Sequence, residues 1–251
     1  MIFSRIIYSS LLPGIAGGLL LTALQIASLN PIIFAAERYQ LNADDVAVEK
    51  NDEHSAHQHE HKHDDEAWAP ADGPERTAYT LLANLLASTG FAAIVLALMC
   101  QFWLRRKAGI SWSQGSLWGL AGFTALFLAP AIGQSPEIPG MAAAAVEHRQ
   151  IWWALCALCV AIGLGIFAFA SVRVKAIGLL FLAIPYLVGA PQADAPMFSH
   201  PDPYVVLALV DLHQQFVVSS AIANLGFWLV MGLTCRFVFN RWLKNIPISD
   251  T

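Results

Sequence analysis

Long apolar runs are the feature of this sequence that most constrains its fold. A helix needs about 20 apolar residues to cross a bilayer, and six runs reach or approach that length: 6–29, 79–103, 112–132, 151–170, 174–190 and 215–239. Inside lipid, a helix satisfies its own backbone hydrogen bonds. The sequence therefore predicts an all-α integral membrane protein, a bundle of about six transmembrane helices. The fifth run is short and contains Pro185, so five spans are the alternative.

The composition and the first run support this class. Hydrophobic residues make up 57% of the chain and charged residues 13%, whereas soluble domains carry about 25% charged residues. The first run is longer than the apolar core of a signal peptide and no clean cleavage site follows it, so we expect a retained helix. The predicted organisation is a first transmembrane helix in 1–29, an extracytoplasmic loop rich in His, Asp and Glu in 30–78, and a transmembrane bundle in 79–251.

Basic residues predict the orientation of the bundle. With both termini in the cytoplasm, the inner segments carry most of the Lys and Arg, while the two short outer loops carry only Arg149. This asymmetry is typical of a multi-pass protein of the bacterial inner (plasma) membrane. In that topology all eight histidines and 17 of the 18 acidic residues lie at the outer side or its edge. The topology itself was predicted from Lys and Arg alone, so this distribution is independent support for it.

Five of the eight histidines lie in one ten-residue stretch of the long outer loop, residues 54–63. Residues 42–72 are too polar to fold alone, so we expect a disordered arm. Four of its histidines alternate in sequence, and on an extended chain they project to one side about 6.8 Å apart. Imidazole suits cobalt, nickel, copper and zinc. We predict a metal-capture arm with ligands His54, His57, His59, His61, His63, Glu60 and Asp64; the alternative is an inert spacer.

Polar residues at the outer ends of the other spans predict a place for the ion to enter. Such residues are costly in a membrane and usually face a cavity or another helix. We predict a vestibule and pathway formed by Glu75, Asn84, Glu137, His148, His200, Asp202, His213 and Asn224. Gln25, Pro130 and Pro185 lie at similar depth. The alternative for each amide is an ordinary hydrogen bond between helices.

Enzyme classes find no support in the sequence. There is no phosphate-binding GxxxxGK[ST] loop, no nucleophile elbow and no HExxH pair, so we predict no catalytic residue and no prosthetic group. No block of Lys and Arg indicates nucleic-acid binding. Four cysteines, Cys100, Cys156, Cys159 and Cys235, lie in spans or at their inner ends. Packing, not disulfide formation or metal binding, is the role that we expect for them.

Several sequence blocks resemble one family. In chain order they are DGPERTAYTLLAN, LAPAIGQSPEIPGM, RQIWW, LVGAP and FVVSSAIANLGFWLVMGL, and together with the His-rich loop they resemble the CbtA family of cobalt transporter subunits. The family's blocks fall on Asp72, Gly73, Glu75, Arg76, Asn84, Pro136, Glu137, Pro139, Gly140, Arg149, Gly189, Pro191 and Asn224. The position before LVGAP, often histidine in the family, is Tyr186 here.

The resemblance implies an inner-membrane protein that supplies cobalt for cobalamin synthesis. It also implies a partner, a CbtB-like small single-span subunit with its own histidines; a homo-oligomer is compatible with the sequence as well. We therefore predict a subunit of a divalent-metal uptake transporter. Cobalt is the first candidate for the transported ion and nickel is the second. The alternatives are a membrane-anchored metal-binding or sensing protein and a metal exporter.

Overall fold

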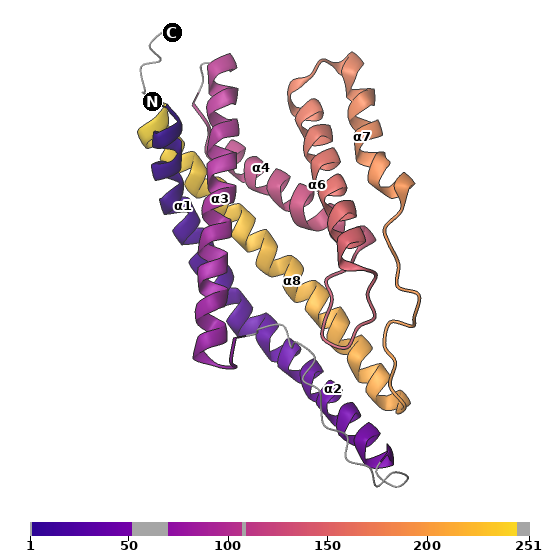
Figure 1. The fold of residues 1–251 in the computed structure, drawn as a ribbon. Helices are drawn as coiled ribbons and strands as arrows, with labels where there is room; N and C mark the ends of the chain where they lie inside the picture. Colours follow the sequence, from indigo (N-terminus) through magenta and orange to yellow (C-terminus); the bar gives the residue numbers. More distant parts are fainter. Residues whose placement is uncertain (1, 52–69, 107–108, 245–251) are drawn as a thin grey trace.

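The protein is a bundle of long helices. The computed structural model describes residues 2–51, 70–106 and 109–244, and within these ranges it contains no strand beyond one isolated bridge between Met141 and Phe198. The elements are α1 (Ile2–Leu24), η1 (Gln25–Leu29), α2 (Asn30–Asn51), α3 (Pro74–Arg106), α4 (Trp112–Phe123), η2 (Thr124–Leu128), α5 (Ala129–Gly133), α6 (Val146–Phe169), η3 (Val172–Val174), α7 (Lys175–Val188), α8 (Pro203–Val238) and η4 (Phe239–Leu243). The predicted all-α membrane fold is confirmed (Figure 1).

Five described segments are long and apolar enough to cross a membrane: Phe3–Gln40, Pro74–Leu104, Trp112–Gly133, Val146–Phe169 and Pro203–Leu243. The remaining apolar run forms α7, which has only 14 residues. At 1.5 Å per residue it is about 21 Å long, less than the roughly 30 Å of a bilayer core. It lies beside α6 (Figure 1). The structure thus favours the five-span alternative, with α7 as a shorter helix.

Three helices extend beyond their predicted ends. The first continues through η1 into α2 as far as Asn51, so residues 30–51, expected in the outer loop, are helical. η1 is a wider π-helical turn, which accommodates Pro31 in the following turn although proline lacks an N–H. Likewise α3 begins at Pro74 and α8 at Pro203, because proline is well suited to a first helical position. Residues 52–69 of the predicted loop lie outside the described ranges.

Glycines set the closest contacts between helices. A Cβ added at Gly18 of α1 would lie 2.9 Å from Leu85 Cα of α3, and one added at Gly119 of α4 would lie 2.3 Å from the backbone oxygen of Trp228 in α8. Both distances are too short for a real side chain, so glycine is what allows the two pairs of backbones to approach. α1 packs mainly on α3 and α8, α4 on α8, and α7 on α6.

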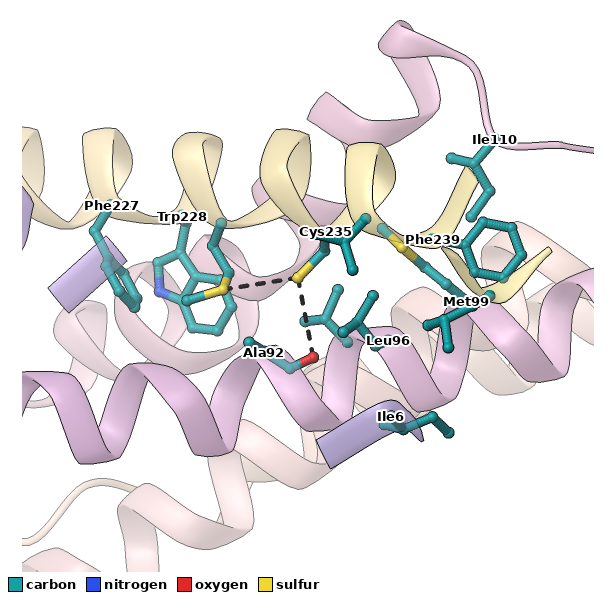
Figure 2. Packing of buried hydrophobic residues seen from close by; sticks show 13 residues of the cluster. Ile6, Ala92, Leu96, Met99, Ile110, Phe227, Trp228, Cys235 and Phe239 are labelled. Atoms are coloured by element: carbon teal, nitrogen blue, oxygen red, sulfur yellow. Dashed lines mark hydrogen bonds between the residues drawn. The ribbon is translucent and has the colours of Figure 1, made fainter. Parts of the chain in front are cut away.

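The largest core lies at the end of the bundle that holds Ile6 and Leu243, which we call the terminal end. Its fully buried side chains come from α3, α8, η4 and the residue Ile110 between helices. Figure 2 shows Cys235 of α8 between Ala92 of α3 and the Met231 sulfur, which lies 3.8 Å from its Sγ. All four cysteines are free. Cys156, Cys159 and Cys235 are buried, as expected for a packing role.

Candidate functional site

The opposite end of the bundle carries the polar side chains that the sequence singled out. At this loop end, α3, α6 and α8 begin and α5 and α7 end (Figure 1). Glu75 and His148 lie in the first turns of α3 and α6, and both are exposed. Glu137, His200 and Asp202 lie in the two connecting loops. The predicted vestibule residues of these loops and helix starts therefore share one end of the molecule.

His213 is the buried histidine of this end. It lies on α8, is 8% exposed, and its Nε2 is 3.1 Å from the Pro136 carbonyl oxygen and 3.3 Å from Ser135 Oγ. The Phe198 ring packs against it edge to face, with ring centroids 6.4 Å apart. His213 thus joins the loop after α5 and the loop before α8 to one helix. Through His213, Ser135 and Pro136 of one loop and Phe198 of the other are held beside α8.

The tautomer of His213 follows from its neighbour. A carbonyl oxygen can only accept a hydrogen bond, so in this arrangement the Nε2 of His213 carries the proton that it donates to Pro136. In the neutral ring the lone pair is then on Nδ1, the nitrogen that can bind a metal ion. The backbone carbonyl is the kind of outer partner that orients metal-binding histidines. In this tautomer Nδ1 is the nitrogen available to a metal ion, and the role of His213 as a ligand stays a prediction.

An ion pair closes the same loop. Arg149 of α6 donates from Nη1 to Glu137 Oε2, and both side chains are about one-third exposed. Gln134 Nε2 and Arg149 Nε are buried and hydrogen-bond to nothing described in the structure. Glu137 is therefore already paired with a cation, and a metal ion would have to compete with Arg149 for it.

His200 and Asp202 shape the start of α8. The Asp202 N–H donates to His200 Nδ1 at 3.0 Å, and Asp202 Oδ1 accepts from the Tyr204 N–H at 2.8 Å. The second contact is an N-cap, which satisfies one of the free N–H groups of a helix start. In this arrangement the His200 nitrogen left for a metal is Nε2. Both residues have a structural role beside the predicted one.

The two predicted intramembrane asparagines differ in their contacts. Asn84 of α3 donates from Nδ2 to Thr22 Oγ1 at 2.9 Å and to Gln25 Oε1 at 2.6 Å, so it joins α3 to α1 and η1. Asn224 donates to the Ser220 carbonyl oxygen of its own helix at 2.9 Å. The hydrogen bond between helices, one of the alternatives from sequence, is thus present for Asn84, whereas Asn224 bonds within α8.

A cavity of about 220 Å³ opens between η1, α2 and α3. Its lining is Ile26, Asn30, Pro31, Phe34, Gly73, Arg76, Thr77 and Thr80. Arg76 donates to Glu37 at 2.9 Å and to Asp72 at 3.0 Å, and its guanidinium lies over the Phe34 ring. Sequence reasoning missed this cavity, because Glu37 was assigned to a loop and not to a helix facing α3.

The described residues do not form one complete metal centre. Among them, no three side chains of His, Cys, Asp and Glu lie close enough together to hold an ion. The predicted vestibule residues share one end without converging on one point. The seven predicted ligands of the capture arm, His54, His57, His59, Glu60, His61, His63 and Asp64, lie outside the described residues. Their role and that of the vestibule stay predictions.

The comparison with known families covers nearly the whole chain. A family model described as "Probable cobalt transporter subunit (CbtA)" matches residues 3–240. That range includes the first four spans, the fifth span as far as residue 240, and every candidate site residue. No curated protein and no solved structure matches the chain.

Proposed function

Because the chain belongs to the CbtA family of probable cobalt transporter subunits, we propose that it is the membrane-embedded subunit of a cobalt importer in the bacterial inner membrane. The family match over residues 3–240 is the observation that carries this proposal. The five apolar spans and the polar residues at the loop end support it. Nickel is the second candidate ion, since imidazole and carboxylate ligands suit both metals.

Capture is the first proposed step. The arm of residues 53–66 holds the histidines that would collect the ion, and in the sequence it lies between α2 and α3. Its ligands would be the imidazoles with help from Glu60 and Asp64. Because imidazole must be neutral to bind a metal, capture should fade as the pH falls through about 6.5.

Transfer into the bundle is the second proposed step. His213 is the strongest receiving ligand because its Nε2 is held by Pro136 and its Nδ1 carries the free lone pair. The other proposed vestibule groups are Glu75, Glu137, His148, His200 and Asp202, and Asn84 and Asn224 would line the path below them. Two paired groups, Glu137 and Asp202, must exchange partners for this to occur.

The description of the family as a subunit implies a partner protein. We propose a small single-span subunit with its own histidines, the CbtB-like protein implied by the sequence resemblance, and a supply of cobalt to cobalamin synthesis. The distribution of Lys and Arg supports cytoplasmic termini. The loop end would then face outward, where the arm meets the ion.

Radiolabelled cobalt uptake tests the proposal. Cells lacking the gene should take up less cobalt under cobalt limitation, and the wild-type gene should restore uptake. Equal uptake with and without the gene would contradict import. If the cells without the gene instead accumulate cobalt and become sensitive to it, the chain is an exporter.

A further inference from the structure

The contact between α1 and α3 places two oxygen acceptors around one point. Asn84 Nδ2 lies 2.9 Å from Thr22 Oγ1 and 2.6 Å from Gln25 Oε1. The Thr22 hydroxyl already donates its hydrogen to the Gly18 carbonyl oxygen at 2.8 Å, so toward Asn84 it can only accept. Thr22 is 5% exposed, and Gln25 and Asn84 are half-buried. Lone pairs of two oxygens therefore converge on the position that Nδ2 occupies.

The local sequence builds this arrangement. Gly18 lies one turn before Thr22, and its missing Cβ lets the α1 backbone approach Leu85 and Asn84 of α3. Gln25 is the first residue of the π-helical turn η1, and such turns redirect side chains and often occur at functional sites. η1 does not interrupt the helix, which runs on from Phe3 to Gln40, so what it brings to this point is the side-chain oxygen of Gln25.

The cavity described above is lined by sequence neighbours of these residues. Ile26 and Thr80 line it; Ile26 follows Gln25 in the chain, and Thr80 lies one helical turn before Asn84. At its rim, two carboxylates, Glu37 and Asp72, are paired with the one guanidinium of Arg76. The surplus of one negative charge favours cations over anions at this entrance.

We propose that Thr22, Gln25 and Asn84 bind a small monovalent cation, sodium. A 180° rotation of the Asn84 amide puts Oδ1 where Nδ2 lies now, so three neutral oxygens then face one another, and a cation bound between them would offset their repulsion. Such oxygens suit hard cations, whereas cobalt and nickel favour imidazole nitrogen. None of the three is a carboxylate that would offset a double charge. If the chain is part of a cobalt importer, as proposed above, this site would let a sodium gradient drive the transport.

Thermal unfolding of the purified full chain in detergent tests the site. The chain is measured in NaCl, KCl and choline chloride at equal ionic strength, without cobalt, so the result does not depend on cobalt import. We expect the midpoint to rise with NaCl relative to choline chloride and to saturate. At a sodium concentration of about ten times Kd, the unfolding equilibrium constant should fall about 11-fold. Equal midpoints in the sodium and choline salts would overturn the proposal.

Asn84→Asp separates a cation site from a plain hydrogen bond. In choline chloride the new carboxylate faces the Thr22 and Gln25 oxygens, so the midpoint should fall. Sodium should restore it and bind more tightly than in the wild type, because three oxygens now face one another. A structural hydrogen bond alone predicts the same loss in every salt, and that result would also overturn the proposal.

Two further variants complete the test. Thr22→Val keeps the side-chain shape and removes one oxygen, so the stabilisation by sodium should be lost. Asn240→Asp is the matched control. Its amide donates to the Ile110 carbonyl oxygen at 2.6 Å and accepts from the Ile110 N–H at 3.2 Å, at the terminal end. Its unfolding midpoint should depend on sodium concentration as that of the wild type does. If Asn240→Asp instead bound sodium more tightly than the wild type, any added carboxylate would produce the effect, and the proposal of a specific site at Asn84 would be overturned.

Discussion

The two ends of the bundle are held together in different ways. At the terminal end, apolar side chains such as Leu96, Met99 and Phe239 are fully buried (Figure 2), and Asn240 hydrogen-bonds to the backbone of Ile110. At the loop end, side chains of different elements bond to one another, as in Glu137 with Arg149 and Glu37 with Arg76. The loop end has its own smaller apolar cluster, which includes Ile32, Phe198 and Phe216. The terminal end therefore rests mainly on apolar packing, while the loop end adds the polar pairs that the proposed transfer would have to open. The two ends should respond differently to substitution.

Phe239→Ala should have the largest effect on stability. The ring is fully buried, and its removal leaves a cavity that the packed helices cannot fill, at a cost of about 3 kcal/mol. Thermal unfolding in detergent measures the loss. Phe237→Ala is the control, because Phe237 is 48% exposed and should lose little. Equal losses in both variants would mean that the terminal end is not a packed core.

Gly119→Ala should come next, with a loss of about 2 kcal/mol. The added methyl group would lie 2.3 Å from the Trp228 backbone oxygen, so α4 and α8 must move apart. Gly165→Ala is the matched control, since nothing lies within 4 Å of its added Cβ and alanine favours the helix. If Gly119→Ala is as stable as Gly165→Ala, the close approach of α4 and α8 is not required.

His213→Gln should affect stability little and cobalt uptake strongly. The glutamine amide can still donate to the Pro136 carbonyl oxygen, so the loss of stability should be about 1 kcal/mol. The imidazole lone pair is lost, and cobalt affinity should fall about tenfold or more. Uptake assays at equal membrane abundance measure this. Wild-type uptake kinetics in the variant would exclude His213 as a ligand.

Deletion of residues 53–66 should have the smallest effect on the bundle. We expect an unchanged unfolding midpoint, because the contacts described between the helices are made by residues outside 53–66. If the arm only concentrates ions, the apparent KM for cobalt uptake should rise and the maximal rate should stay the same. A complete loss of transport would instead make the arm part of the path.

The apolar runs predicted the fold class because lipid allows few structures, and the polar residues predicted which end carries the candidate site. Contacts between distant residues could not be predicted. Asn84 was singled out from its depth in a span, but its partner Thr22 lies 62 positions away and reaches it only through the close contact at Gly18. The extension of α1 into α2 was also missed, because Pro31 and the polar sequence from Glu37 onward resemble a loop unless the π-helical turn at Gln25 is known.

Cobalt flux into proteoliposomes tests the central claim most directly. The purified chain, with any subunit that co-purifies, is reconstituted and given radiolabelled cobalt outside the vesicles. The account predicts saturable accumulation inside, abolished when the chain is left out and reduced by His213→Gln. Cobalt that binds to the vesicles but never enters them would contradict it and identify a metal-binding or sensing protein.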